Sequence, residues 1–179
     1  MARGKSSLPT KPTIILDTRE QKPLFAENPD GDKEVAAYIR AKVDAGDYTI
    51  LDVPNLVIAE RKAHGKELFS NLVLKREVFM RSIERMRKFK HKYIIIEQTY
   101  AEFLDPRNWT FIGNTKRRYQ AIATVESWLI SLSQTEDIHF FFTGEKHAAR
   151  AVKKILVKTY EWHRKQLMKK DKELDDLTD

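Results

Sequence analysis

The chain has 179 residues, of which 41% are hydrophobic, and a formal net charge of +7, because 33 Lys and Arg stand against 26 Asp and Glu. This length suits one soluble globular domain, and no apolar run approaches the roughly 18 residues that a membrane span needs, so we expect no membrane segment. The absence of cysteine excludes disulfides, thiolate metal sites and cysteine nucleophiles, and the six glycines form neither a Walker loop nor a dinucleotide fingerprint.

Residues 1–12 are basic and polar, so we expect a flexible arm rather than a secretory signal. Hydrophobic periodicity and turn residues predict the elements that follow. In chain order these are a strand over 13–17, a loop over 22–31, a helix over 32–43, strands over 48–53 and 56–62, a helix over 66–90, a strand over 93–97, a loop over 105–115, a helix over 116–132, a strand over 138–142 and a helix over 145–162. The alternation indicates an α/β fold with a mainly parallel or mixed sheet, one domain over 13–165 and a charged tail over 166–179 that frays from 171.

The excess positive charge is concentrated in one stretch. Between Arg61 and Lys92 there are eleven Lys or Arg and three Glu, whereas the rest of the chain has 22 basic and 23 acidic residues. Such a concentration is expected of a protein that binds a phosphate backbone, and it is equally compatible with a solvated helix face. Arg81, Arg85 and Lys88 lie near one face of the predicted helix and are our candidates for contacts with DNA phosphates.

Acidic residues stand at or beside the ends of the predicted strands. Asp17 closes the first strand and Glu20 follows it, Asp47 opens the second, and Glu60 lies near the end of the third with Lys62 two residues on. Because side chains alternate along a strand, Glu60 and Lys62 share one face. Carboxylate oxygens suit a hard cation such as Mg²⁺, which can polarise a phosphoryl oxygen. The pattern therefore favours a metal-dependent phosphodiesterase in which Lys62 acts as an ammonium rather than as a base.

Each of these short motifs also has a purely structural interpretation. Gly-Asp is a common turn dipeptide, and Glu-Arg-Lys is a common string on any surface. Their order along the chain, each after an apolar strand, is what favours a site.

In this order the motifs resemble those of the XPF-type branched-DNA nucleases, whose signature is G-D followed at a variable distance by E-R-K-x-x-x-D. The helix at 76–86 is similar to one in short bacterial and phage members of that family. The matching segments are LDTRE at 16–20, GDY at 46–48, ERK at 60–62, REVFMRSIERM at 76–86 and IIIE at 94–97, and a looser likeness continues to residue 156.

The resemblance implies a restriction-endonuclease-like fold, a central mixed sheet flanked by helices, a divalent cation (Mg²⁺ or Mn²⁺) and cleavage of phosphodiester bonds in branched DNA at flaps, forks or junctions. By position it assigns Asp47 and Glu60 as metal ligands and Asp17 and Glu20 as the upstream acidic pair, with Asp17 also expected at the metal. It assigns Lys62 as the catalytic lysine. The motif arginines are Arg19, Arg61 and Arg76, near DNA or supporting the site, and the main-chain carbonyl of Arg61 would complete the metal shell.

This sequence departs from the family pattern at three points. Lys66 stands where the motif has Asp, and Glu67 follows it directly, so a shift of one residue would let Glu67 substitute. Ser82 stands where short members often carry an acid. Within these 179 residues we expect no paired helix-hairpin-helix domain like that of eukaryotic and archaeal members, which leaves junction specificity and a dimer built through that domain open.

One further cluster mixes aromatic and basic residues. Trp109, Phe111 and Tyr119 lie near the basic triplet at 116–118 and could form a stacking surface for single-stranded or frayed DNA. Alternatively, two of the aromatic side chains pack in the core and the triplet is an exposed first helical turn.

Three classes of function are therefore weighed. An active endonuclease uses every acid named above, whereas a catalytically silent DNA-binding module partnering another nuclease subunit would not need them. An RNA-binding or scaffold protein explains the basic helix but not the acids, which repel nucleic acid unless a cation neutralises them. We expect an endonuclease in the cytoplasm, associated with the nucleoid in a bacterium or phage and nuclear in a eukaryote, with DNA as partner and a possible homodimer.

Overall fold

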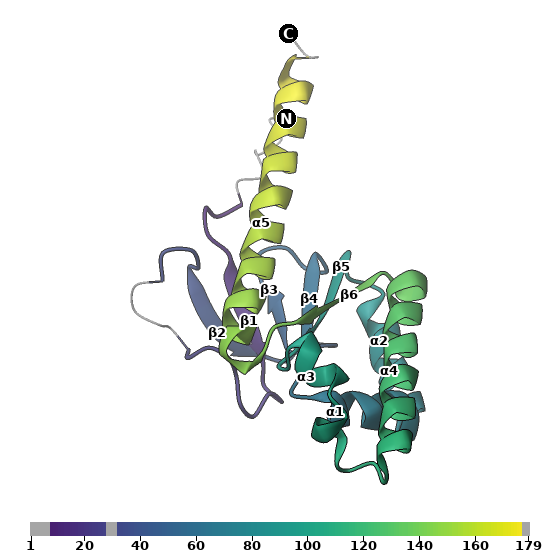
Figure 1. Ribbon diagram of the computed structural model, residues 1–179. Coiled ribbons are helices and arrows are strands. Elements are labelled where there is room, and N and C mark those ends of the chain that lie inside the picture. The colour runs from purple at the N-terminus through teal and green to yellow at the C-terminus, as the bar shows by residue number, and fades with distance from the viewer. Residues whose placement is uncertain (1–7, 28–31, 177–179) are drawn as a thin grey trace.

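The computed structural model describes residues 8–27 and 32–176, and in this part of the chain six strands form one mixed sheet with helices on both faces (Figure 1). The strand order across the sheet is β2-β1-β3-β4-β5-β6. The strands are β1 (Thr13–Asp17), β2 (Ala37–Ala41), β3 (Tyr48–Ile50), β4 (Val57–Lys62), β5 (His91–Ile96) and β6 (Ile138–Phe142). The helices are α1 (Gly65–Phe69), the π-helical turn η1 (Ser70–Leu74), α2 (Arg76–Met86), α3 (Tyr100–Leu104), the 3₁₀ turn η2 (Pro106–Trp109), α4 (Thr115–Glu136) and α5 (Glu145–Asp176).

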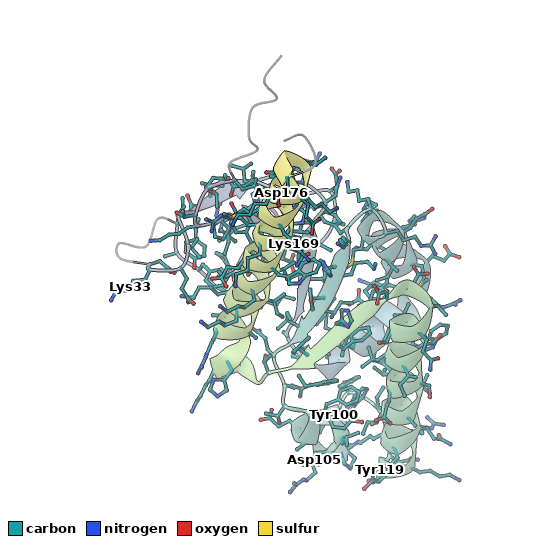
Figure 2. All side chains as sticks on the ribbon, turned by 90° about the horizontal axis from the view of Figure 1, so that it is seen from above. Lys33, Tyr100, Asp105, Tyr119, Lys169 and Asp176 are labelled. Carbon is teal, nitrogen blue, oxygen red and sulfur yellow. The ribbon has the colours of Figure 1, made fainter. Side chains whose placement is uncertain are left out.

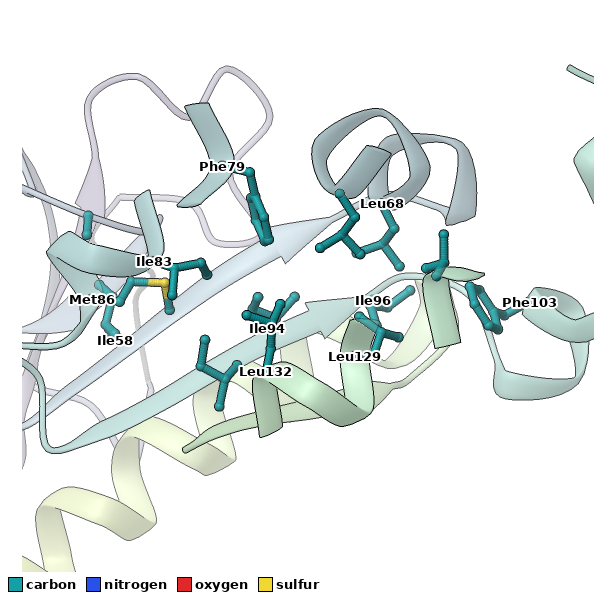
Figure 3. Packing of buried hydrophobic residues seen from close by; sticks show 14 of the residues in the cluster. Ile58, Leu68, Phe79, Ile83, Met86, Ile94, Ile96, Phe103, Leu129 and Leu132 are labelled. Atoms are coloured by element: carbon teal, nitrogen blue, oxygen red, sulfur yellow. The ribbon is translucent and has the colours of Figure 1, made fainter. Parts of the chain in front are cut away.

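The apolar side chains of the sheet divide into two cores. On β4, Ile58 packs on one face with residues of α1, α2 and α4, while Val57 and Ala59 pack on the other face with residues of α5. Figure 3 shows the first of these cores, where Phe79 and Ile83 of α2 face the sheet. The α/β class and the mixed sheet flanked by helices, both predicted from the sequence, are confirmed.

Five strands run parallel, and β3 is antiparallel to both of its neighbours. The C-terminal ends of β1 and β4 therefore lie at the same edge of the sheet, and β3 begins there. This edge gathers the acids that the sequence places at the ends of β1 and β4 and at the start of β3.

The prediction of a helix over 32–43 is wrong. Ala37–Ala41 is strand β2, which pairs in parallel with β1. Tyr38 and Ile39 favour extended backbone, and pairing with the edge of β1 outweighs the helical spacing of the apolar residues. Asp32, expected to cap a helix, instead accepts hydrogen bonds from the backbone N–H groups of Glu34 and Val35.

The helix predicted over 66–90 is divided into three pieces. α1 continues directly into η1, which ends at Leu74. Lys75, with a φ of −120° and a ψ of 34°, is not helical, and α2 begins at the next residue. The predicted strand over 48–53 ends at Ile50, and α4 and α5 are longer than predicted. Residues 166–176 continue α5 as helix, including the part expected to fray, and Figure 1 shows α5 extending well beyond the sheet.

The chain ends differ in how far they are described. In the expected arm, residues 1–7 lie outside the described residues, whereas Pro9 and Pro12 accept hydrogen bonds from Tyr160 Oη and the Ala36 N–H. Residues 177–179 of the tail also lie outside the described residues. Among the helices of residues 8–27 and 32–176, none combines the length and the apolar character that crossing a membrane requires.

Candidate active site

The acids at the strand ends meet in one cleft of about 500 Å³. Its walls come from the end of β1, the turn before β3, the end of β4 and one face of α2. Seven residues proposed from the sequence line it, namely Asp17, Arg19, Glu20, Asp47, Glu60, Arg61 and Arg85. The structure thus brings together residues that are up to 68 positions apart in the chain (17 to 85).

Asp47 lies at the floor of the cleft, where Gly46 turns the chain into β3. Gly46 has a φ of +69°, and a Cβ there would lie 2.6 Å from the Ile58 side chain, so the turn requires glycine. The Asp47 backbone N–H donates to the Ala59 carbonyl at 2.9 Å, and Asp47 Oδ2 accepts from the Arg61 N–H at 2.7 Å. These two bonds fix the carboxylate against β4.

The electrostatic environment of Asp47 disfavours its charged form. Burial, and next the charge of Glu60, raise the pKa of Asp47 to about 7, despite the hydrogen bond from Arg61. Within the described residues, Asp47 Oδ1 and Glu60 Oε2 accept no hydrogen bond. Two neighbouring carboxylates with spare oxygens are an arrangement that a bound cation relieves.

Lys62 is buried behind Glu60, with 6% of its surface exposed. Its Nζ donates to Glu60 Oε1 at 2.5 Å and lies 3.3 Å from Glu67 Oε1. Burial acts to lower the pKa of Lys62, but the charges of Glu60 and Glu67 outweigh burial and raise it, so the amine is an ammonium at neutral pH. Glu67 is thus the acid beside Lys62, while Lys66 at the motif position lies over the Phe111 ring at 5.9 Å.

Asp17 has quite different surroundings. Its Oδ1 accepts from the backbone N–H and Nε of Arg19, and its Oδ2 accepts from the Val43 N–H and Nη2 of Arg19, all at 2.7–3.0 Å. Burial acts to raise the pKa of Asp17, but these hydrogen bonds outweigh it and hold the pKa below its usual value. Asp17 therefore ties the end of β1 to Arg19 and to the segment after β2, and its oxygens are already engaged.

Arg61 is held by carboxylates rather than exposed to solvent. Its Nη2 donates to Glu97 at 2.9 Å, and its Nη1 lies 3.3 Å from Glu20 and donates to the Lys22 carbonyl at 2.7 Å. Only 16% of the side chain is exposed, and within the described residues its buried Nε has no partner. The guanidinium thus fixes Glu20 on the cleft wall, and little of it remains to reach a DNA phosphate.

The cations of α2 and of the turn after it that were proposed to contact DNA divide into two groups. Arg85 lines the cleft and donates to the Asp44 carbonyl at 3.0 Å, and Arg81 is exposed on the same helix. Arg76 and Lys88 lie away from the cleft. The Arg76 guanidinium stacks 4.4 Å above the Trp128 ring, and Lys88 forms an ion pair with Asp44.

Sequence reasoning did not assign two groups that hold Arg61 in place at the cleft. Glu97 anchors Arg61, and the Lys22 carbonyl does the same from the loop after β1. Glu97 could have been predicted, because it follows an apolar strand in the same way as Asp17 does. Nothing in the residue type could have indicated a main-chain carbonyl.

The donor set can be compared with the needs of a metal ion. Within the described residues, no group of three or more His, Asp or Glu side chains could hold a metal by itself. Asp47 and Glu60 supply two carboxylates, and the Arg61 N–H that binds Asp47 places the Arg61 carbonyl on the same edge of β4. Mg²⁺ is commonly held by one or two carboxylates, with waters and substrate phosphates completing its shell. The residues present fit such an ion.

Comparisons with known proteins agree on the fold. No family model matches the chain, and no curated protein matches it. Two solved structures of XPF from Aeropyrum pernix, one of them in complex with DNA, have similar folds, with TM-scores of 0.54 and 0.57 at 18% and 19% identity. The matches cover 80% and 83% of this chain and 64% of each XPF chain. The XPF-like fold implied by the sequence motifs is therefore confirmed.

Proposed function

We propose that the chain is a DNA endonuclease that depends on Mg²⁺ or Mn²⁺ and cleaves phosphodiester bonds in branched DNA. The observation that carries the proposal is the pairing of Asp47 and Glu60 in an open cleft, with spare carboxylate oxygens and the Lys62 ammonium beside them. The complex of XPF with DNA adds support, because its fold is similar. The order of the motifs, and not the fold alone, is what favours the enzyme.

In this proposal Asp47, Glu60 and the Arg61 carbonyl hold the cation. When bound, it would supply positive charge that polarises the phosphoryl oxygen under attack. The Lys62 ammonium is not among the described residues that line the cleft, but it contacts Glu60, which does, and from there its positive charge would stabilise negative charge that develops on the phosphate.

Asp17 and Glu20 are assigned here to positioning rather than to the metal. Asp17 uses both oxygens to hold Arg19 and the Val43 N–H, and Glu20 is engaged by Arg61 and by the Lys22 N–H. Arg19, with 59% of its side chain exposed, is placed to meet a phosphate that enters the cleft. The Asp17 carboxylate would orient it.

Duplex DNA would approach the cleft across α2. Arg85 lines the cleft and Arg81 is exposed on α2, and neither forms an ion pair with a carboxylate among the described residues. Removing either charge should weaken binding to all DNA sequences about equally, because phosphate contacts carry no sequence information. A homodimer, a location beside cellular DNA and closeness to short bacterial or phage nucleases stay predictions.

The test is cleavage of labelled flap, fork and linear duplex DNA in Mg²⁺ or Mn²⁺ by the native chain and by Asp47→Asn. The matched control is Asp137→Asn, an exposed residue with a φ of 53°, where Asn is equally suited. Metal-dependent cleavage near the branch, lost in Asp47→Asn and kept in Asp137→Asn, supports the proposal. Tight binding to every substrate without cleavage overturns it and favours a catalytically silent DNA-binding module.

A further inference from the structure

The aromatic residues near the start of α4 do not form the stacking surface considered from the sequence. Trp109 is buried and donates from Nε1 to the Phe103 carbonyl at 2.7 Å, so it is unable to stack with a ligand. Phe111 packs on Trp109 with ring centroids 5.4 Å apart. Tyr119 is exposed near the start of α4 (Figure 2). Two of the three aromatic side chains therefore pack in the core, and we look for a further binding site in the cleft itself.

Two arginines from distant parts of the chain are held on neighbouring carbonyl groups in the cleft. Arg19, from the loop after β1, and Arg85, near the end of α2, both line the cleft. Arg19 Nη2 donates to the Val43 carbonyl at 2.6 Å, and Arg85 Nε donates to the Asp44 carbonyl at 3.0 Å. Because Val43 and Asp44 are consecutive residues, one short segment of backbone holds both guanidinium groups. This segment brings together two cations that are far apart in the sequence.

Each of these guanidinium groups keeps N–H groups that no other described residue engages. Arg19 uses Nε and Nη2 on Asp17 and Val43, so its Nη1 is available. Arg85 uses only Nε, so both of its Nη groups are available. An arginine that is oriented from one side loses less entropy when its remaining donors bind an anion. Planar guanidinium groups with spare donors suit the oxygens of a phosphate.

The hydroxyl of Ser82 is a third available donor in the same cleft. Ser82 lies about one helical turn before Arg85, so the two side chains share a flank of α2. Hydroxyl groups inside α4 donate to the carbonyl four residues back, as those of Thr124, Ser127 and Thr135 do at 2.8–2.9 Å. Ser82 Oγ forms no such bond and no other hydrogen bond with the described residues, although the side chain is partly buried. It is therefore free to donate to a ligand.

The surroundings of Arg19 connect these donors with the proposed cation site. The hydrogen bond to Asp17 raises the pKa of Arg19, and the charges of Asp47 and Glu60 add to this rise, although burial acts against it. Arg19 thus lies close enough to both carboxylates to be influenced by their charge. A cation bound between these carboxylates would cancel their repulsion of a phosphate and leave the arginines to attract it.

We propose that Arg19, Ser82 and Arg85 form a phosphate clamp, a site that binds one backbone phosphate of the DNA strand in the cleft. The available N–H groups of the two arginines and the Ser82 hydroxyl donate to its oxygens. Phosphate contacts fix the position of a strand without reading its sequence, so the clamp would set which phosphodiester bond lies at the cation. This role rests on the proposed function, but binding of the phosphate does not depend on cleavage.

The first experiment measures binding of a fluorescent DNA duplex in EDTA, by anisotropy over a range of salt concentrations. Arg85→Gln should lower the slope of log affinity against log salt by about 0.9, the value for one phosphate contact. Lys33→Gln is the control, because it removes an exposed cation that projects from the outer surface (Figure 2) and should leave the slope unchanged.

A second pair of variants tests the geometry rather than the charge. Arg85→Lys keeps the charge but removes the planar group that binds the Asp44 carbonyl and a phosphate together, so affinity should fall about 10-fold with an unchanged salt slope. Arg81→Lys is the matched control on the same helix. Because Arg81 is exposed and does not line the cleft, this variant should bind within about 2-fold of the native chain.

A double-mutant cycle tests whether the donors share one phosphate. Ser82→Ala should weaken binding about 2- to 10-fold, as expected for one hydrogen bond, with an unchanged salt slope. Ser127→Ala is its control, because the Ser127 hydroxyl already donates to the Ala123 carbonyl on α4. In Ser82→Ala/Arg85→Gln the loss of binding free energy should be smaller than the sum of the two single losses, because each group acts through the same phosphate.

Several results would overturn the proposal. These are an unchanged salt slope in Arg85→Gln, equal affinity of Arg85→Lys and the native chain, or strictly additive losses in the double variant. A loss of affinity in Arg85→Lys that is matched by a loss of thermal stability would also overturn it, in favour of a structural arginine. The Asp47→Asn variant separates the two proposals, because in EDTA it should bind the duplex at least as tightly as the native chain, whether or not the native chain cleaves DNA.

Discussion

Both sides of the cleft place acids at strand ends. Asp17 lies on the β1 side, and Asp47 and Glu60 lie on the β3–β4 side, but the surroundings shift the pKa of Asp17 and the pKa of Asp47 in opposite directions. Asp17 accepts four hydrogen bonds, and its pKa lies below the usual value. Asp47 accepts one, next to a second carboxylate, and its pKa is raised to about 7. A buried charge that is fully hydrogen-bonded stabilises the fold, whereas one that is not is available to a ligand. The number of donors therefore separates a structural acid from a candidate ligand.

The largest effect should come from Asp47→Asn. The amide keeps the acceptor for the Arg61 N–H but removes one of the two carboxylates proposed to hold the cation. Cleavage should fall by roughly 10²–10⁴-fold. Thermal unfolding of the metal-free variant at pH 8 should show stability equal to or above that of the native chain, and a marked loss of stability would place Asp47 with Asp17 as a structural acid.

Lys62→Met tests the ammonium that lies behind Glu60 of the cleft. Met keeps the length and apolar stem of the side chain but removes the ammonium that contacts Glu60 and Glu67. We expect single-turnover cleavage to fall on the order of 10²–10³-fold. Lys172→Met is the control on exposed α5, and equal rates for the native chain and Lys62→Met would contradict the proposed role.

The titration of Asp47 should contribute to the pH dependence of stability. Because its folded pKa of about 7 lies above the ordinary 3.8, the native state binds more protons than the unfolded state between these values. Stability of the metal-free chain should therefore fall as pH rises from about 4 to about 7 and level off above, by no more than about 4 kcal/mol from this group. Urea unfolding measured across this pH range should show that the free energy of unfolding depends less steeply on pH in Asp47→Asn than in the native chain. An equally steep dependence on pH in both would exclude Asp47 as the cause.

Of these changes, Asp17→Asn should have the smallest effect on cleavage, and its main effect should be a loss of stability. An amide brings its own N–H₂ group against the donors of Arg19 and Val43, so the free energy of unfolding should drop by about 1.5–3 kcal/mol at pH 7. Because the folded pKa of Asp17 is lowered, this difference should persist above the unfolded pKa near 3.8 and vanish as pH falls through the folded value. Urea unfolding at pH 7 and at pH 3 checks it. If Asp17→Asn is as stable as the native chain but unable to cleave DNA, Asp17 is a metal ligand, as expected from the sequence, rather than a structural acid.

The sequence was most informative where local and tertiary preferences agree. Apolar runs ending in an acid located β1, β4 and β5 within two residues, because a buried strand needs such a run in any fold. Strand β2 was missed, since its pairing with β1 depends on residues far away in the chain. The cleft residues were predicted as a group, but nothing local reveals that Asp17 meets the Val43 N–H while Asp47 meets Glu60.

The short strand β3 has a consequence for how the domain opens. Its three residues, Tyr48–Ile50, join the β2-β1 pair to the β4-β5-β6 sheet by antiparallel pairing on both sides. Because Asp47 immediately precedes β3, any fluctuation that detaches this strand divides the sheet and dismantles the cleft floor in one event. Amide hydrogen exchange at Thr49 and Ile50 would therefore report the integrity of the cleft in the absence of DNA and metal, and a cation bound at Asp47 should slow that exchange.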